Sequence, residues 1–206
     1  MSTTLLPMRL VARRGNWQRF MGRKASPAYP SIKEKILNRD QYTCRFCGFQ
    51  SQQFQEIVNI DHNYSNNAES NLATTCSFCA PCFFLDCVGA DGKSGGTIIH
   101  LPEVNQADLN HFCRALFCSL LRETPYKGKL QAVYLSFQDR AKAVEDTFGP
   151  HAQEPNVFGQ SIIDSGLTEQ QLQHPLLTEL KFLPTRKFYK NQAEVWKTTV
   201  FANIPL

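Results

Sequence analysis

Two Cys-x-x-Cys pairs, Cys44/Cys47 and Cys76/Cys79, constrain the fold of this 206-residue chain more than any other feature of its sequence. Pairs with this spacing can supply four soft thiolate ligands to one ion, and Zn²⁺ held by four cysteines forms a closed tetrahedral site. Such a site leaves no open coordination position for chemistry. It stabilises a segment that has little apolar core of its own. We therefore expect a structural zinc ion bound by these four cysteines.

The spacing of the cysteines leaves other ligand sets open. The 28 residues 48–75 separate the two pairs, against roughly 15–20 in a simple zinc ribbon, so we expect a strand-loop unit between the knuckles. Cys82 and Cys87 follow the second pair in a run that resembles those of iron–sulfur proteins. The ferredoxin pattern ends in Cys-Pro after a three-residue gap, which this run lacks, so zinc is favoured. Cys82 remains an alternative ligand in place of Cys76 or Cys79, and Cys87 a candidate free thiol.

Basic residues are unevenly distributed along the chain. Residues 1–30 hold six of the 22 lysines and arginines and no acid, which leaves 16 basic and 18 acidic residues in the rest, a net charge of −2. A nucleic-acid enzyme usually spreads positive charge over its binding face. Trp17, Phe20 and Met21 lie at helical spacing within this arm. We expect the arm to dock on the body through these side chains, and we do not expect nucleic-acid binding.

Local patterns predict an α+β fold in which a zinc-knuckle core precedes a mainly helical half. Residues 56–61 and 95–103 are rich in β-branched side chains and are expected to form strands. A capping box at Ser31 predicts a helix that ends near Asp40. Asn105 begins the clearest amphipathic helix of the chain. The remaining expectations are a helix over 130–148, a loop over 150–166, short helical pieces at 168–173 and 175–183, and a tail from 184 without a clear period.

Residues 40–85 resemble the HNH endonuclease family, whose ββα-metal segment runs from one knuckle through Asp-His and Asn-Leu to a second knuckle. Asp61, His62 and Asn71 match those positions. The resemblance implies a His general base and a divalent ion held by the Asp and by a His directly after the second knuckle. Ala80 stands at that last position and cannot hold a metal ion. Asp61, His62 and Asn71 are therefore expected to be catalytic vestiges; the alternative is a metal-dependent nuclease with an altered ligand set.

The order of motifs along the whole chain is similar to that of the IcmJ (DotN) family of the Dot/Icm type IVB secretion system. The motifs are the basic arm, YTCRFCGF at 42–49, the HNH-like middle, CSFCAPCFFLD at 76–86, GGTIIHLPE at 95–103 and a helical half. The resemblance implies a non-enzymatic cytoplasmic adaptor of the coupling complex, which recruits effector proteins for export. The partners that it implies are the C-terminal extension of the coupling ATPase, DotL, and other coupling-complex proteins at the inner-membrane face.

The motifs divide the chain into three expected parts. These are the basic arm 1–30, an HNH-like zinc-binding segment 31–95 and a mainly helical part 96–206 that forms one compact unit with the zinc segment. No run of about 18 apolar residues is present, so no membrane span is expected. The N-terminus lacks the continuous apolar stretch of a secretory signal, which favours a cytoplasmic location. A groove between the zinc lobe and the helical half is the expected place for a partner segment.

Overall fold

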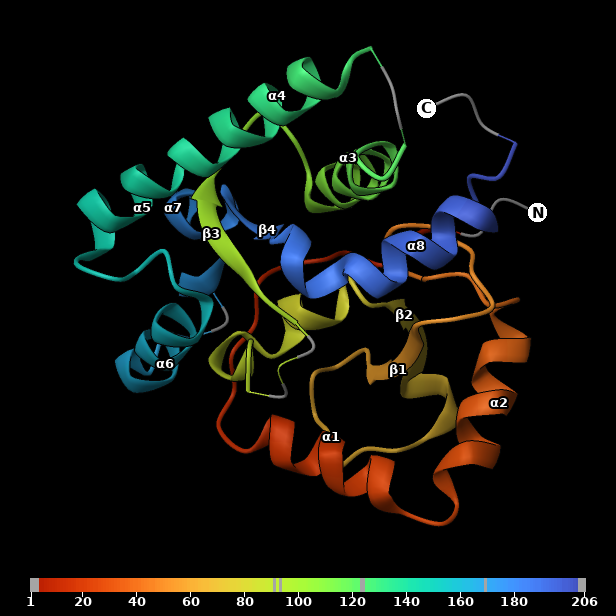
Figure 1. Cartoon of the computed structure of the whole chain (residues 1–206). Coiled ribbons are helices and arrows are strands. Elements are labelled where there is room, and N and C mark those ends of the chain that lie inside the picture. Colours follow the sequence, from red (N-terminus) through yellow and green to blue (C-terminus); the bar gives the residue numbers. More distant parts are fainter. Residues whose placement is uncertain (1–3, 91, 93, 123–124, 169, 204–206) are drawn as a thin grey trace.

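The computed structural model of the chain contains two small antiparallel sheets surrounded by helices (Figure 1). It describes residues 4–90, 92, 94–122, 125–168 and 170–203; the first three residues of the expected arm and the last three of the helical part lie outside this range. The strands are β1 (Gln55–Asn59), β2 (Leu72–Cys76), β3 (Gly96–His100) and β4 (Leu180–Pro184). The helices are α1 (Asn16–Ala25), α2 (Tyr29–Arg39), α3 (Gln106–Ser119), α4 (Lys127–Asp139), α5 (Ala141–Phe148), α6 (Pro155–Ser165), α7 (Pro175–Thr178) and α8 (Lys190–Thr198). These elements confirm the predicted α+β class.

The hairpin of β1 and β2 carries the second cysteine knuckle at its end. The strands pair antiparallel with Gln55 opposite Cys76, and β1 covers most of the strand predicted at 56–61. Helix α2 packs on this hairpin through Ile36, which lies in one buried cluster with Ile57. In Figure 1 this lobe, with α1 and α2, occupies the lower right of the view, α3 to α6 occupy the top and left, and α8 crosses the centre above the hairpin.

The N-terminal segment before α1 runs in extended form beside the knuckles. Leu6 N donates a hydrogen bond to Arg45 O at 2.7 Å. Val11 N donates to Cys82 O at 2.7 Å, and Val11 O accepts from Leu85 N at 3.0 Å. These backbone bonds attach the segment to the lobe that carries the knuckles in the manner of an added strand, so its course is fixed by the residues around both knuckles.

Helix α1 places the aromatic residues of the arm in the core. The Phe20 side chain is 3% exposed. Its ring lies 4.8 Å from that of Phe84 and 6.0 Å from that of Tyr64, and Trp17 stacks edge-on against Phe84 at 5.4 Å. The helix therefore docks through Trp17 and Phe20, as their helical spacing predicts. The expectation that Met21 also docks is wrong, because its side chain is 41% exposed.

The second sheet joins two strands that lie 80 residues apart in the chain. β3 and β4 pair antiparallel with Gly96 opposite Pro184, so the strand predicted at 95–103 is confirmed over its first part. The prediction of helix throughout 175–183 is wrong, because α7 ends at Thr178 and the chain continues as β4. All five residues of β4 are buried, and a short run that is buried on both faces has no periodicity to distinguish a strand from a helix.

The helices after α3 differ in detail from their prediction. The start of α3 is confirmed, because the Asn105 side chain accepts a hydrogen bond from Asp108 N at 2.9 Å. The single helix expected over 130–148 is two helices that meet at Arg140. The loop expected over 150–166 is wrong, since α6 fills most of it. The cap expected at Ser31 is also wrong: α2 begins two residues earlier, with a proline in its first turn, where a missing N–H costs nothing.

Helix α6 packs on the short 3-10 helix Leu85–Cys87 through Gly159. A Cβ atom at this position would lie 2.3 Å from Asp86 N, a backbone atom that cannot swing aside. Gly159→Ala is therefore expected to lower the free energy of unfolding by about 1–3 kcal/mol, because the added methyl group forces the helix away from its support. Thermal unfolding followed by circular dichroism measures this change. Gly22→Ala, at a helical glycine with open space around it, is the control, and equal melting of the two variants would contradict the packing argument.

Candidate metal centre

The structure brings four cysteine sulfur atoms together at the junction of the two lobes. The Sγ atoms of Cys44, Cys47, Cys76 and Cys79 all lie within 4.8 Å of one another, and all four side chains are buried. Cys47 Sγ and Cys76 Sγ are 3.7 Å apart. Four sulfurs bound tetrahedrally to zinc at the usual Zn–S length are separated by about 3.8 Å. The thiol cluster therefore has the dimensions of a zinc site, and these four ligands would hold the ion.

The first knuckle is a tight turn locked to β2. Gly48 N donates to Cys44 O at 2.8 Å, and Cys44 N donates to Phe49 O at 2.9 Å. Gly48 has φ +75°, a left-handed conformation that favours glycine and that brings the two thiols of the pair to one side. Arg45 N donates to Thr74 O at 2.9 Å. This last bond ties the knuckle to the strand that carries the second pair.

Cys82 and Cys87, which follow the second knuckle, lie outside the group of four. Cys82 is fully buried, but its sulfur packs in a different apolar cluster, with Phe158 and Phe182, and burial raises its pKa. Cys87 is partly exposed, with its Sγ 3.4 Å from a carboxylate oxygen of Asp86. Burial and that carboxylate raise the pKa of Cys87 to about 12, which disfavours the thiolate form that a metal needs.

Helix α3 directs polar side chains at the sulfur atoms. Asn110 Nδ2 donates to Cys79 Sγ at 3.2 Å. Arg114 Nη2 donates to Cys76 Sγ at 3.3 Å. Asn110 and Arg114 are four residues apart, so they lie on one face of the helix, and both are 0% exposed. Sequence reasoning missed them, although two polar residues among the apolar positions of a buried helical face were a visible signal.

The Arg114 guanidinium is the only positive charge that the described residues bring into contact with the cluster. Its carbon lies 3.6 Å from the ring centroid of Phe49, and the rings of Phe78 and Trp196 are also near. A Zn²⁺ ion with four thiolates carries a net charge of −2, and Arg114 offsets one unit of it. Burial opposes ionisation of Cys76, yet hydrogen bonds from the other three thiols and the charge of Arg114 lower the pKa of Cys76 well below its ordinary value.

The donor set fits zinc as a structural ion. Four buried thiolates supply soft ligands in a closed shell, and the hydrogen bonds from α3 orient two of the sulfurs from outside that shell. When bound, the ion would add folding free energy and no reactive position. Because the ligands come from residues 44–79 and the orienting groups from α3, the site connects the two lobes of the chain.

Both oxygens of the Asp61 carboxylate accept hydrogen bonds from residues of its own loop. Its Oδ1 accepts hydrogen bonds from Asn63 N at 2.8 Å and from Asn71 Nδ2 at 2.9 Å. Its Oδ2 accepts from Asn66 Nδ2 at 2.8 Å. Although desolvation opposes ionisation, these bonds lower the pKa of Asp61. The pair Asp61 and Asn71, which matches the HNH pattern, thus closes the loop between β1 and β2.

His62 lies beside the ring of Phe83, close in the chain to Ala80, where the HNH pattern has its second metal ligand. Its ring lies 5.5 Å from the ring of Phe83 at an angle of 31°. Phe83 belongs to the 3-10 helix that begins at Ala80, and residues three apart in such a helix lie on the same face. Ala80 and Phe83 therefore present an apolar surface beside His62, and this surface offers no ligand atom to an ion.

The likeness to known proteins extends over nearly the whole chain. No protein-family model matches it. Type 4 apparatus protein DotN of Legionella pneumophila is 43% identical over 197 residues, which cover 96% of this chain and 92% of the relative. The chain belongs to the DotN family. This membership confirms the resemblance to the IcmJ (DotN) family and indicates a component of a type IV secretion apparatus.

In this member of the DotN family, the helices were compared with the length and apolar character that a membrane-spanning helix needs. Among the residues that the structure describes, none of the helices has both the length and the apolar character needed to cross a bilayer.

Proposed function

We propose that this chain is a non-catalytic, zinc-containing adaptor of a type IVB secretion coupling complex. It binds the C-terminal extension of a DotL-like coupling ATPase, together with other proteins of that complex, and takes part in recruiting effectors for export. It acts in the cytoplasm, at the inner-membrane face. The observation that carries the proposal is the nearly full-length relationship to DotN, joined to a closed site of four thiols with no reactive position.

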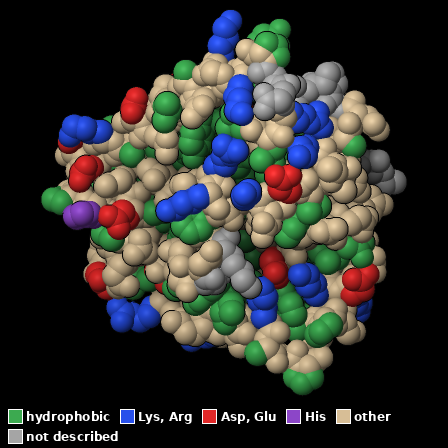
Figure 2. All heavy atoms as spheres, in the orientation of Figure 1, with side chains coloured by type: hydrophobic (Ala, Val, Ile, Leu, Met, Phe, Trp, Pro, Cys, Tyr) green, Lys and Arg blue, Asp and Glu red, His purple; other side chains and the backbone are tan. Residues whose placement is uncertain are grey.

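The distribution of charge supports a protein partner over nucleic acid. On the face seen in Figure 2, acidic and basic side chains are interspersed. Two basic residues of the arm bond to the body: Arg23 donates to Asn59 Oδ1 at 2.6 Å, and Lys24 to Glu56 Oε1 at 2.8 Å. Charges engaged in this way are poorly placed to displace the counterions of a phosphate backbone.

The zinc segment and the helical part act as one unit in this proposal. The proposed division is an arm over 1–30, an HNH-like zinc segment over 31–95 and a mainly helical part over 96–206. Asn110 and Arg114 of the helical part bond to the sulfurs of the zinc segment, which supports a shared core. Neither segment is then expected to keep its fold when expressed alone.

Co-expression tests the adaptor function directly. The full chain is produced with the C-terminal extension of the coupling ATPase from the same organism, and the purified material is analysed by size exclusion with light scattering. A stable complex of the two polypeptides is the expected result. Separate elution of the two chains at micromolar concentration, with both folded, would overturn the proposed partner.

A plasmid-nicking assay tests the absence of nuclease activity. The purified chain is incubated with supercoiled plasmid and Mg²⁺ or Mn²⁺, beside His62→Ala. We expect no cleavage by either protein, because Asp61 bonds to its own loop and Ala80 supplies no ligand. Cleavage that is lost in His62→Ala would instead establish an HNH-type nuclease with an altered ligand set.

A further inference from the structure

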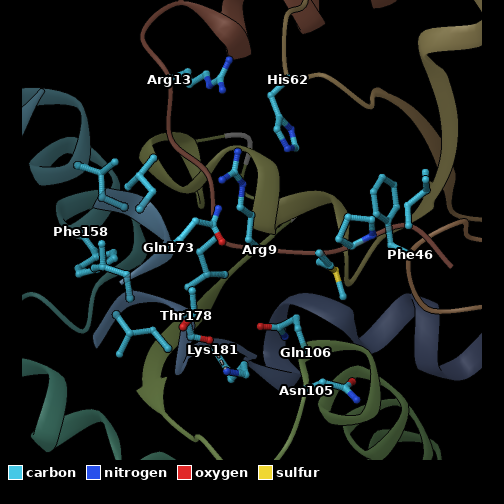
Figure 3. A pocket seen from close by; sticks show the side chains of 18 of the residues that line it. Arg9, Arg13, Phe46, His62, Asn105, Gln106, Phe158, Gln173, Thr178 and Lys181 are labelled. Atoms are coloured by element: carbon cyan, nitrogen blue, oxygen red, sulfur yellow. Dashed lines mark hydrogen bonds between the residues drawn. The ribbon is translucent and has the colours of Figure 1, made fainter. Parts of the chain in front are cut away.

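A cavity of about 840 Å³ lies between the N-terminal segment, the loop after β1 and the part of the chain that follows β3. Figure 3 shows Arg9, Arg13 and His62 around its upper part and Thr178 and Lys181 below. The volume is within the range of specific ligand pockets, about 300–1,000 Å³. Because its walls come from segments far apart in the sequence, the cavity exists only in the assembled fold.

The walls of the cavity combine cationic and apolar side chains. Arg9, Arg13 and Lys181 supply positive charge, and Asp61 is the only acidic residue among the described lining residues. Both Asp61 oxygens already accept hydrogen bonds from the loop described above. The apolar wall includes Phe46, Phe158, Ile162, Leu172, Leu177 and Leu180. A ligand that complements this surface carries negative charge and apolar groups together.

Lys181 is the most informative residue of the cavity. It lies on β4 and is 7% exposed. Its ammonium donates to Thr178 O at 2.9 Å, and no carboxylate oxygen of the described residues lies within the 4.0 Å of an ion pair. An ammonium group has three N–H donors, and burial without a counterion is costly. Burial lowers the pKa of Lys181 accordingly.

The carboxylates that act on Lys181 electrostatically are bonded elsewhere. Glu179 Oε2 lies 3.0 Å from His100 Nε2, and Glu103 is held by Arg140 at 2.8 Å. The chain therefore places a nearly buried cation at the cavity and directs the neighbouring acids to other partners. A carboxylate from outside the chain would complete this arrangement.

The start of α3 argues against a phosphate ligand in the same cavity. Asn105 and Gln106 line the cavity, but the Asn105 side chain already accepts from Asp108 N. Gln106 is committed as well, since it exchanges hydrogen bonds with the backbone of Phe182 at 2.7 Å. A helix terminus that is capped, with an acid in its first turn, does not offer the free amides that phosphate groups use.

We infer that this cavity binds an acidic peptide segment of a partner protein. One carboxylate of the segment bonds to the Lys181 ammonium, and a neighbouring aliphatic side chain packs on Phe158, Ile162 and Leu177. The choice of a peptide as occupant rests on the proposed adaptor function, whereas the preference for a carboxylate rests on the charges of the cavity alone.

Fluorescence anisotropy with three labelled octapeptides tests this site. All three contain leucine at alternate positions, and the intervening residues are glutamate, glutamine or lysine. The glutamate peptide should bind to the full chain, and the glutamine peptide at least about tenfold more weakly, because an amide oxygen can accept the hydrogen bond from the ammonium but lacks the negative charge that strengthens it. Raising the salt from about 50 to 500 mM should weaken binding of the glutamate peptide.

Two variants test whether the peptide binds in the cavity. Lys181→Met keeps the aliphatic stem and removes the charge, and it should fold, because it removes a buried charge that has no ion-pair partner. Ile162→Glu adds a repelling charge at a partly exposed wall and keeps the site testable if Lys181→Met does not fold. Both should reduce affinity for the glutamate peptide at least about tenfold. Lys142→Met, which removes an exposed lysine paired with Asp146 on α5, is the matched control and should bind as wild type.

Other outcomes either overturn the inference or separate the cavity from the proposed partner. Equal binding of the glutamate and glutamine peptides, or wild-type binding by both cavity variants, would overturn it. Displacement of the peptide by millimolar succinate or inorganic phosphate would identify a site for small anions instead. If Lys181→Met and Ile162→Glu still form the complex with the ATPase extension but bind no peptide, the cavity and the ATPase interface are separate; if the wild type binds the peptide but not the extension, the proposed partner fails and the site stands.

Discussion

Substitution of Cys79 by serine is expected to release the metal ion and to remove most of the stability of the protein. Cys79 lies in the buried group of four thiols, and a serine hydroxyl at this position does not replace a thiolate ligand. Binding of a structural zinc ion contributes on the order of 10 kcal/mol, which is comparable to the whole stability of a domain. We expect the melting temperature to fall by more than about 10 °C, or the cooperative transition to disappear.

Metal analysis beside thermal unfolding checks this result. The wild type should contain one zinc per chain and no visible absorption, whereas a brown protein would indicate iron–sulfur chemistry. Cys113→Ala is the matched control, because Cys113 is equally buried on α3 but lies outside the thiol group. It should lose only about 1 kcal/mol through the small cavity and should keep the metal. If Cys44→Ala and Cys79→Ser both melt like the wild type, the ion has no structural role.

The grouping of the four cysteines was predictable because the information is local. A Cys-x-x-Cys pair needs only one tight turn to direct two sulfurs to one point, and Gly48 supplies that turn in the first knuckle. The two pairs meet because Arg45 N in the first knuckle donates to Thr74 O of β2, the strand that ends in Cys76. The orienting groups were not predictable in the same way, because Asn110 and Arg114 come from a helix about 30 residues further along the chain.

The errors in the fold have a common physical origin. β4 is buried throughout, so its apolar run carries no alternation from which a strand could be recognised. Helix α6 packs on a 3-10 helix through Gly159, a residue that lowers helix propensity in any estimate from sequence. Pro155 at its first turn and Gly166 after its end were the signals that could have revealed it. In both β4 and α6, tertiary packing determines the secondary structure and overrides the preference of the local sequence.

The HNH-like motif shows a different limit of sequence reasoning. The absence of a ligand at Ala80 is visible in the sequence. The role of Asp61 is not, because the same Asp-His and Asn-Leu order describes both a metal ligand and a carboxylate that closes its own loop. Only the hydrogen bonds from Asn63, Asn66 and Asn71 distinguish the two, and they favour the second.

Arg114→Met is expected to destabilise the protein by about 3–5 kcal/mol, as removal of one partner from a buried charge pair usually does. The guanidinium is fully buried, donates to Cys76 Sγ at 3.3 Å and stacks on Phe49. Methionine fills much of the same volume, so the loss is one of charge and hydrogen bonds more than of packing. Arg114→Lys should recover only part of it, since an ammonium group cannot reproduce the planar stacking and the directed hydrogen bonds.

Urea unfolding in the presence of excess zinc separates the charge of Arg114 from its packing. The deficit of Arg114→Met should persist at saturating zinc, because the uncompensated negative charge belongs to the metal-bound form. Arg14→Met, at an exposed arginine paired with Asp164, is the control and should change stability by less than about 1 kcal/mol. If Arg114→Met proved as stable as the wild type, the cost of burying the guanidinium would equal its attraction to the thiolates. The cluster would then tolerate its full charge of −2, and α3 would serve the site through Asn110 alone.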